Sequence, residues 1–355
     1  TCYFGRAKPG FGAPEEVSLP PSIRVRPVTN LYWPGSQYRV MWQVGVGKLL
    51  RGRHDVIVCP EVVHNLAVWW VVLLHGLFGK RLVLFGHGYR PVQASRGLPG
   101  ALRKWARRLL LGRARAVIAY TERGREECLD LGVPAEAVFV CRNTMDIHRL
   151  RALETRVDEA SLRRLREELG TDDQRLVVLF LGKIRRRKRL DVLLEGARLV
   201  HDSGTPITVM VIGDGPERAA AQAAAGEVPW LHFLGAIYDE AELAPYFLVA
   251  DVLVLPGALG LTCVHGFAHG VPTVTSSDRA LLQTPEYDYL VDGHNGLIVA
   301  SAEPGDYADL LRRLASDRSR VSALKAGARA SGDEMGIDLM AERFAEAVKH
   351  GGGMR

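Results

Sequence analysis

The chain alternates short apolar runs with longer segments in which apolar and polar residues recur at helical spacing. Such runs are typical of buried parallel strands, and the segments between them are typical of helices that cover a sheet. In the second half the pattern predicts strands over Leu176–Leu181, Ile207–Ile212, Leu231–Leu234, Asp251–Leu255, Thr273–Thr275 and Gly296–Val299. The helices predicted there include Arg189–Val200, Glu217–Ala225 and Glu240–Ala250. Alternation of this kind predicts a doubly wound α/β domain.

The first half shows the same alternation less clearly. Its predicted strands lie at Ile23–Arg26, Asp55–Cys59, Arg81–Phe85, Ala116–Ala119 and Val138–Cys141, and its predicted helices at Met41–Leu50, Leu66–Leu77, Gly100–Gly112 and Glu122–Leu131. Because 355 residues exceed one usual hydrophobic core, the predicted fold class is α/β with two Rossmann-like doubly wound domains. The expected division is 1–150, 151–335, and a C-terminal helix with a disordered tail over 336–355.

Charge distinguishes the two halves. Residues 1–150 contain 22 Lys/Arg and 10 Asp/Glu, whereas residues 151–355 contain 24 and 30. A basic half can face nucleic acid, anionic lipid or an anionic substrate. The five cysteines are scattered, odd in number and free of CxxC spacing, which favours a reducing compartment and argues against a zinc site. No apolar run reaches the roughly 18–20 residues that a membrane span needs.

The segment 101–111 combines cationic and apolar faces. Leu102, Trp105 and Leu109 lie on one side at helical spacing, and most of the cations, Arg103, Lys104, Arg107 and Arg108, lie on the other. Basic amphipathic helices of this kind bind anionic membrane surfaces. A surface helix packed on its own sheet gives the same pattern, so both interpretations stay open.

Ligands of open α/β sheets bind beyond the carboxyl ends of strands, so the residues after each strand are the candidates. Six cations occupy the seven positions from Lys183 to Arg189, after the strand that ends at Leu181. Cations at a strand end that face free backbone N–H groups suit a diphosphate, although a solvated basic loop is the alternative. Gly213 follows the next strand, where a tight turn explains it as well as a ligand contact does. Gly235 follows the strand after that and begins a segment that could offer backbone groups to a base.

The segment from Pro256 to Pro272 joins two predicted strands through a glycine loop and a short helix. Gly257 and Gly260 allow a tight turn, and Thr262 is a favourable residue at the start of a helix. A strand, a glycine loop and a helix start can together bind an anion. An ordinary connection that binds nothing is the alternative.

In the first half, His87 lies between two glycines just after a predicted strand, where it could reach a substrate. The sequence has no Walker phosphate loop, no complete dinucleotide fingerprint and no Gly-x-Ser-x-Gly elbow. It also lacks a spaced Asp-x-Asp pair for a nucleotide-bound metal, and no pair of acids stands out as glycosidase carboxylates.

Several motifs together resemble one family. They are Gly182-Lys183 followed by Lys188, Ile212-Gly213-Asp214-Gly215-Pro216, Phe233-Leu234-Gly235, Ala250-Asp251-Val252, Gly260-Leu261, Gly270-Val271-Pro272, Asp292-Gly293-His294-Asn295-Gly296 and Asn143-Thr144-Met145-Asp146. This set resembles the GT-B fold retaining glycosyltransferases of family 4, also called glycosyltransferase group 1. The resemblance covers nearly the whole chain and implies two Rossmann-like domains that face each other across a cleft.

The resemblance implies a UDP- or GDP-linked sugar donor, no other cofactor, no metal and no nucleic-acid partner. Lys183 and Lys188 would neutralise the diphosphate, and His87 would lie near the reacting sugar. Donor-binding positions would be Gly182, Gly213, Gly235, Ile237, Gly257, Gly260, Leu261, Thr262 and His265. The acceptor would be a glycan or a lipid-linked molecule in cell-surface polysaccharide or glycolipid synthesis. The protein is then expected in the cytoplasm, attached peripherally to the inner membrane face through the 101–111 helix.

Two departures from the family pattern leave alternatives. The family's Glu-x7-Glu motif aligns with Gly257 and His265, and His265 could still bond the ribose. The strand and helix that open family members are expected to be missing before the strand at Thr1–Phe4. A non-catalytic GT-B protein that binds sugar nucleotides is therefore an alternative, and a GT-B epimerase is a weaker one because its paired acids are not evident.

Overall fold

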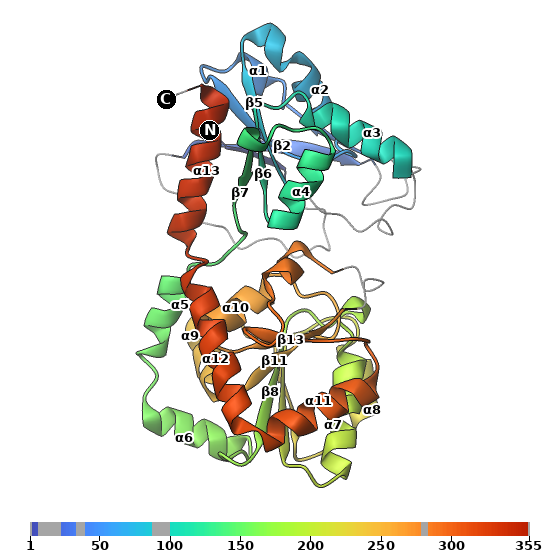
Figure 1. Ribbon diagram of the computed structural model, residues 1–355, viewed down its shortest axis with the longest axis vertical. Coiled ribbons are helices and arrows are strands. Elements are labelled where there is room, and N and C mark those ends of the chain that lie inside the picture. The colour runs from blue at the N-terminus through green and yellow to red at the C-terminus, as the bar shows by residue number, and fades with distance from the viewer. Residues whose placement is uncertain (1, 6–22, 33–39, 87–99, 278–282, 354–355) are drawn as a thin grey trace. The chain divides into compact units, whose positions relative to one another are not determined.

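The computed structural model describes residues 2–5, 23–32, 40–86, 100–277 and 283–353 (Figure 1). The chain forms two compact units, Thr1–Cys141 with Glu342–Arg355, and Arg142–Ala341. Both contain parallel sheets covered by helices, so the predicted α/β class is confirmed.

The first unit contains two sheets. One has the order β1-β2-β3, with β1 (Cys2–Gly5) parallel to β2 (Val25–Tyr32) and β2 antiparallel to β3 (Met41–Val44). The other is parallel throughout and has the order β4-β5-β6-β7, with β4 Val56–Pro60, β5 Arg81–Gly86, β6 Ala116–Ala119 and β7 Val138–Val140. The helices of this part are α1 (Lys48–Arg51), α2 (Leu66–Leu74), η1 (His75–Phe78), α3 (Gly100–Leu111), α4 (Glu122–Asp130) and η3 (Ala135–Ala137). Buried aliphatic residues of β4, β5, β6, α2 and α3 form its core.

The predicted helix over Met41–Leu50 is wrong for its first part. Met41–Val44 is strand β3, whose side chains alternate between half-buried and exposed, and only Lys48–Arg51 is helical. Gly45 separates the two with a φ of +95°, which glycine adopts without the clash that a Cβ causes.

The tail predicted to be disordered is largely helical. The last helix, α13, extends from Ile337 to Gly352, and Gly351 and Gly352 are buried against the first unit (Figure 1). A Cβ on Gly351 would lie 2.5 Å from a methyl group of Val83, so glycine lets the helix approach the sheet. The ring of Phe344 lies 6.3 Å from that of Phe85 and adds a second contact. The chain end thus belongs to the first unit rather than to a separate segment 336–355.

The prediction that Arg107 lies on a cationic surface of its helix is also wrong. Its guanidinium pairs with Glu61 at 2.5 Å and with Glu127 at 3.1 Å, and only 15% of its side chain is exposed. Burial opposes the charged form, but the Glu61 and Glu127 carboxylates raise the pKa of Arg107 above its usual value. Arg107 therefore ties α3 to β4 and α4.

The second unit contains one six-stranded parallel sheet with the order β10-β9-β8-β11-β12-β13. Its strands are β8 Leu176–Leu181, β9 Ile207–Ile212, β10 Leu231–Gly235, β11 Val252–Val254, β12 Thr273–Ser276 and β13 Gly296–Val299. The strand positions follow the sequence prediction within a residue or two. From β8 the chain first moves outward to β9 and β10, and then returns to β11 and moves the other way. This reversal makes the sheet doubly wound.

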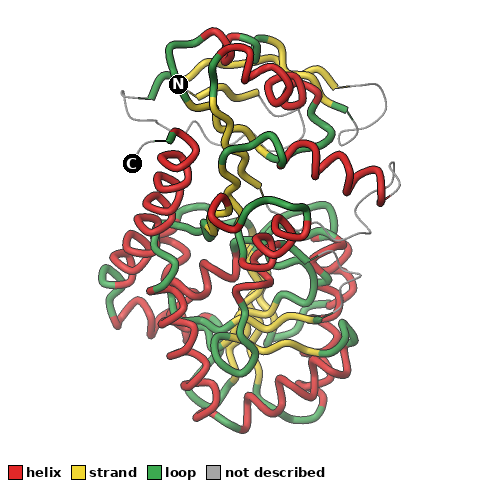
Figure 2. Tube along the Cα trace, turned by 45° about the horizontal axis from the view of Figure 1, so that its top comes forward, coloured by secondary structure: helices red, strands yellow, loops and turns green. Residues whose placement is uncertain are grey.

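Helices cover both faces of this sheet, and Figure 2 shows its strands surrounded by helices. The helices α7 (Leu190–Asp202) and α11 (Pro304–Ser316) pack together, as do α10 (Thr262–Ala268) and α12 (Arg318–Asp333). The remaining helices are α5 (Ile147–Glu154), α6 (Glu159–Glu168), η4 (Arg186–Lys188), α8 (Arg218–Ala225), α9 (Glu240–Val249) and η6 (Pro285–Tyr289). Because α5 and α6 both pack on α9, residues 142–150 belong to this unit and not to the first.

A buried carboxylate holds the amino end of this sheet. Oδ2 of Asp251 accepts hydrogen bonds from the backbone N–H of Val177 at 2.9 Å and from Arg318 at 2.8 Å, and Nη2 of Arg318 donates to Oδ1 at 3.0 Å. The Asp251 side chain is 7% exposed. The contacts connect the loop before β11 to β8 and α12.

We expect Asp251→Ala to lower the free energy of unfolding by about 2–3 kcal/mol, because hydrogen bonds to a charged group are lost and a buried N–H loses its partner. Urea denaturation measures the change. The matched control is Glu195→Ala, which removes an exposed ion pair with Arg198 and should change stability by less than about 1 kcal/mol. Equal effects of the two substitutions would show that Asp251 has no special structural role.

Candidate functional site

The candidate site lies at the carboxyl ends of β8 and β11, where the strand order of the second unit reverses. β8 has β9 on one side and β11 on the other, and these two neighbours are reached by connections that move in opposite directions. Ligands of doubly wound sheets bind at such a switch point. The two segments that the sequence singled out, Lys183–Arg189 and Pro256–Pro272, each begin two residues beyond the end of one of these strands.

Backbone contacts hold the loop after β8 between the loops after β9 and β11. The N–H of Ile184 donates to the carbonyl oxygen of Asp214 at 2.9 Å, and the N–H of Ala258 donates to that of Arg187 at 3.0 Å. Glycine is required in both neighbouring loops, at positions 213 and 257. A Cβ on Gly213 would lie 2.0 Å from the carbonyl oxygen of Gly182, and a Cβ on Gly257 would lie 2.0 Å from that of Arg187. The three loops therefore form one rigid layer.

Lys188 is the buried cation of this layer. It is 8% exposed, and its ammonium donates to the carbonyl oxygen of Leu259 at 2.7 Å. Burial above all, together with the Arg187 guanidinium, lowers the pKa of Lys188 to about 8, while Cys263 and Glu286 oppose the shift. Keeping a lysine charged here costs free energy, and such costs are concentrated at functional sites.

Gly182, Lys188 and the start of α10 enclose a corner with room for a methyl-sized group. A Cβ on Gly182 would lie 3.8 Å from Nζ of Lys188 and 3.8 Å from Oγ1 of Thr262, so glycine at 182 leaves this corner unfilled. In the described part of the chain, no hydrogen bond is found for the backbone N–H of Leu261 or Thr262. An ammonium, a hydroxyl and two N–H donors thus come together, and this donor set suits a phosphate.

Gly260 is fixed by a contact that the sequence did not indicate. Its N–H donates to Oγ1 of Thr284 at 2.8 Å, and its φ of +67° lies in the left-handed region. Two residues after Thr284, the buried Glu286 accepts a hydrogen bond from the side chain of Asn143 at 3.1 Å. Neither Thr284 nor Glu286 follows a strand, so the search beyond strand ends could not find them.

Lys183 and the arginines that follow it are more accessible than Lys188. Lys183, Arg186 and Arg187 are exposed, and no ion pair to them is found among the described residues. Arg189 is paired with Asp191 at 3.1 Å. From the sequence, Lys183 and Lys188 have the same predicted role. The structure separates them, because Lys183 is an exposed cation and Lys188 is a buried one.

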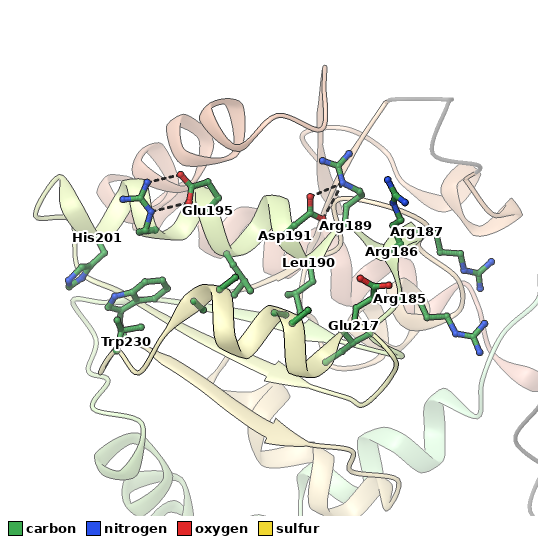
Figure 3. Close-up of a pocket in the computed structure, with 18 of the residues that line it drawn as sticks. Arg185, Arg186, Arg187, Arg189, Leu190, Asp191, Glu195, His201, Glu217 and Trp230 are labelled. Atoms are coloured by element: carbon green, nitrogen blue, oxygen red, sulfur yellow. Dashed lines mark hydrogen bonds and ion pairs between the residues drawn. The ribbon is translucent and has the colours of Figure 1, made fainter. Parts of the chain in front are cut away.

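Arg185–Arg187 also border a hollow of about 1190 Å³ between α7 and α8, which Figure 3 shows. Its opposite end is formed by Trp230, whose ring stacks on His201 at 5.5 Å. Along α7, Arg198 is neutralised by Glu195 at 2.6 Å and by Asp202 at 2.7 Å. The Lys188 corner combines a buried ammonium with backbone N–H groups for which no partner is found in the described part of the chain, so we place the candidate site there.

His265 lies on α10, and its side chain contacts residues of α9. Its Nε2 is 3.0 Å from a carboxylate oxygen of Glu240, and its ring packs 4.4 Å from that of Phe247. Glu240 was not among the predicted site residues, although it lies only five residues beyond the end of β10. Inspecting helix starts as well as strand ends would have found it.

The remaining predicted site residues lie in different surroundings or outside the described part of the chain. The carbonyl oxygen of Gly235 accepts from the N–H of Gly213 at 2.7 Å, and Ile237 packs partly on the core. Gly257 cannot bear any side chain in this conformation, because the Arg187 carbonyl occupies the space. His87 lies outside the described residues.

Comparisons with known proteins show which families the two parts of the chain match. Residues 5–149 match the family described as Glycosyltransferase Family 4, and residues 175–317 match the family described as Glycosyl transferases group 1. The chain is 29% identical to a D-inositol 3-phosphate glycosyltransferase of Streptomyces bingchenggensis over 68% of its own length and 54% of the relative's. It therefore spans about half of that relative. It is 28% identical to a 2-deoxystreptamine glucosyltransferase of Streptomyces kanamyceticus over 86% of this chain and 75% of the relative.

A solved structure shows the same fold. The Anabaena protein Alr3699/HepE in complex with UDP superimposes with a TM-score of 0.66, at 18% sequence identity, over 86% of this chain and 81% of the other. Identity this low is informative about fold alone.

The depressed pKa of Lys188 predicts a pH-dependent stability. Between about pH 8 and the ordinary lysine pKa near 10.5, the unfolded chain binds more protons than the folded protein, so this residue's contribution to stability increases as pH rises. At pH 7 the residue is charged and buried. We expect Lys188→Met to stabilise the protein by about 1 kcal/mol at pH 7, because a buried charge is replaced by an apolar side chain of similar size.

Urea denaturation at pH 7 and pH 10 measures both effects, and the advantage of Lys188→Met should shrink at the higher pH. Lys183→Met is the matched control, since an exposed lysine should change stability by no more than about 0.5 kcal/mol. A Lys188→Met protein that is less stable at both pH values would refute the electrostatic cost.

Proposed function

Since the chain belongs to the group 1 glycosyltransferases, we propose that it transfers a sugar from a nucleotide-diphosphate sugar to an acceptor hydroxyl with retention of anomeric configuration. The observation that carries the proposal is the buried Lys188 ammonium beside the unfilled corner at Gly182. A cation fixed at the switch point of the sheet is suited to a diphosphate, because it can stabilise the charge that develops as the nucleotide leaves.

In the proposed reaction, the bond between the anomeric carbon and the diphosphate oxygen breaks while the acceptor oxygen bonds to that carbon on the same face. The acceptor's proton passes to the departing phosphate oxygen. Lys188, Lys183 and the N–H groups of Leu261 and Thr262 stabilise the diphosphate, so the reaction uses no metal ion. His87 would lie near the reacting sugar.

The nucleotide is proposed to be UDP or GDP. UDP is the first choice, because the structure of the similar Anabaena protein contains it. The loop that begins at Gly235 would offer backbone groups to the base, since this loop follows β10, two strands away from Lys188.

Two acceptor classes are supported by different observations. The basic first half favours the glycan or lipid-linked acceptor of cell-surface polysaccharide or glycolipid synthesis. The names of the relatives, which specify inositol 3-phosphate and 2-deoxystreptamine, favour a small cyclitol instead. Nucleotide release measured with each acceptor class in turn separates the two.

Attachment to the cytoplasmic membrane face is a further part of the proposal. On α3, Trp105 is 60% exposed and Leu102 is 45% exposed. Residues 62–121 contain ten Lys/Arg and no Asp/Glu, so this region attracts anionic lipid. No helix among the described residues is long and apolar enough to cross a membrane, so attachment would be peripheral.

The alternative is a non-catalytic protein that binds sugar nucleotides. Gly257 supports it, since the family's first glutamate is replaced by a position with no room for a side chain. Isothermal titration with UDP and GDP, followed by nucleotide release from candidate sugar donors, tests both readings. Binding with release supports the transferase, binding without release supports the alternative, and neither binding nor release refutes both.

Lys188→Ala should lower turnover on the order of a hundredfold, because one preorganised donor to the leaving group is lost. Steady-state nucleotide release with the preferred donor measures this. Arg198→Ala, which removes an exposed cation of α7 outside the donor cluster, serves as the control and should keep its turnover. Full turnover in Lys188→Ala would refute the role of Lys188.

For the membrane, we expect the protein to sediment with liposomes that contain anionic lipid at low salt and to be released as salt rises, because screening weakens the attraction. Trp105→Ser should weaken sedimentation, since an exposed interfacial aromatic ring is removed. Liposomes of neutral lipid alone are the control. Equal sedimentation with neutral and anionic liposomes, or with neither, would contradict peripheral electrostatic attachment.

A further inference from the structure

Glu240 and His265 form a carboxylate–imidazole pair at the carboxyl edge of the second unit's sheet. Nε2 of His265 lies 3.0 Å from Oε2 of Glu240, and the two side chains are 7% and 30% exposed, respectively. Glu240 begins α9, which follows β10, whereas His265 lies in α10, which follows β11. The pair thus joins two elements that end on the same side of the sheet.

The histidine has little freedom to turn. Its ring packs 4.4 Å from the ring of Phe247 and 5.4 Å from that of His269. His269 is itself held by Glu154, 2.8 Å from its Nδ1. His265 is therefore tightly packed, and its Nε2 lies 3.0 Å from a carboxylate oxygen of Glu240.

Helix capping does not account for Glu240. The cap of α9 is the preceding residue, Asp239, whose side chain accepts from the N–H of Ala241 at 2.7 Å. Oε2 of Glu240 lies within ion-pair distance of His265 but without hydrogen-bond geometry, and no partner for its other carboxylate oxygen is found in the part of the chain that the structure describes. Burial alone would raise the pKa of Glu240, but the imidazole of His265 lowers it below its ordinary value, so the carboxylate is ionised at neutral pH.

The pair lies one helical turn from the phosphate corner. His265 is three residues beyond Thr262 on α10, which corresponds to a rise of roughly 4.5 Å. Residues three apart share a helix face. A nucleoside diphosphate with its phosphates at Lys188 and its base near the end of β10 would therefore place its ribose between these points, near Glu240. Carboxylates are the groups that commonly accept hydrogen bonds from ribose hydroxyls in nucleotide sites.

We propose that Glu240 binds the ribose hydroxyls of the donor nucleotide, and that His265 is a positioning residue that fixes the Glu240 carboxylate. This assignment rests on the proposed function, because it needs a nucleotide at the Lys188 corner. The assignment places a ribose-binding carboxylate on α9. Neither Gly257 nor His265 has a carboxylate side chain.

The test compares UDP with 2′-deoxy-UDP by isothermal titration of the whole chain. Wild type should bind UDP roughly 10–100-fold more tightly than 2′-deoxy-UDP, because only UDP has the 2′-hydroxyl that can donate a hydrogen bond to the charged Glu240 carboxylate. Glu240→Ala should bring this ratio close to one by weakening UDP alone, and Glu240→Gln should restore part of it. His265→Phe keeps a ring against Phe247 but removes the nitrogen, and should reduce the ratio without abolishing it.

Glu242→Ala is the matched control, because it removes an exposed carboxylate from the same first turn of α9. It should leave the ratio unchanged, and thermal unfolding of each variant verifies folding. The proposal is overturned if Glu240→Ala keeps the wild-type ratio, or if it weakens UDP and 2′-deoxy-UDP equally. Wild type that binds neither nucleotide would instead refute the proposed function, and this assignment with it.

Discussion

The site depends on the close backbone packing of three loops at one edge of the second sheet. The loop after β8 is held by hydrogen bonds from Ile184 to Asp214 and from Ala258 to Arg187. Such contacts are possible only where side chains are absent, and glycines at 213 and 257 meet that need. The same packing covers Lys188 and excludes water from it. A lysine in an open loop would be a weak, screened cation, whereas here it is a fixed charge in a partly dry corner.

The resemblance aligns the family's two glutamates with Gly257 and His265, and the structure shows what surrounds each of these positions. At position 257 the loss is structural, because the Arg187 carbonyl fills the space where a side chain would begin. At position 265 the change is one of chemistry. An imidazole replaces a carboxylate, and its partner Glu240 supplies a carboxylate from the neighbouring helix. A carboxylate therefore lies beside position 265, on α9 instead of α10.

The first unit shows a different use of charge. Its only acids between residues 17 and 121 are Asp55 and Glu61, and Glu61 forms a buried ion pair with Arg107. The exposed charge of this stretch is therefore more positive than its composition suggests. Exposed apolar side chains such as Trp105 lie among these cations. Both features favour an anionic partner, while neither identifies it.

Pattern alone located the strands of the second unit, since buried parallel strands form uninterrupted apolar runs. It was less reliable where tertiary contacts override local preference. Met41–Val44 has helix-compatible residues but pairs with β2 as a strand, and the glycine-rich end of α13 is helical because it packs on β5. Arg107 fits a cationic stripe by spacing, yet two acids distant in sequence draw it inward.

By itself, the sequence predicted the α/β fold from its apolar periodicity, the family from its resemblance in motifs, and Lys188 as a candidate from the cations placed after a strand. The tertiary structure alone decided that Gly257 has no room for a side chain, that Lys188 is buried while Lys183 is exposed, and that His265 faces Glu240. Each of these facts depends on the meeting of segments distant along the chain. The order in which strands pair determines which loops meet, and the spacing of residues along the sequence does not specify that order.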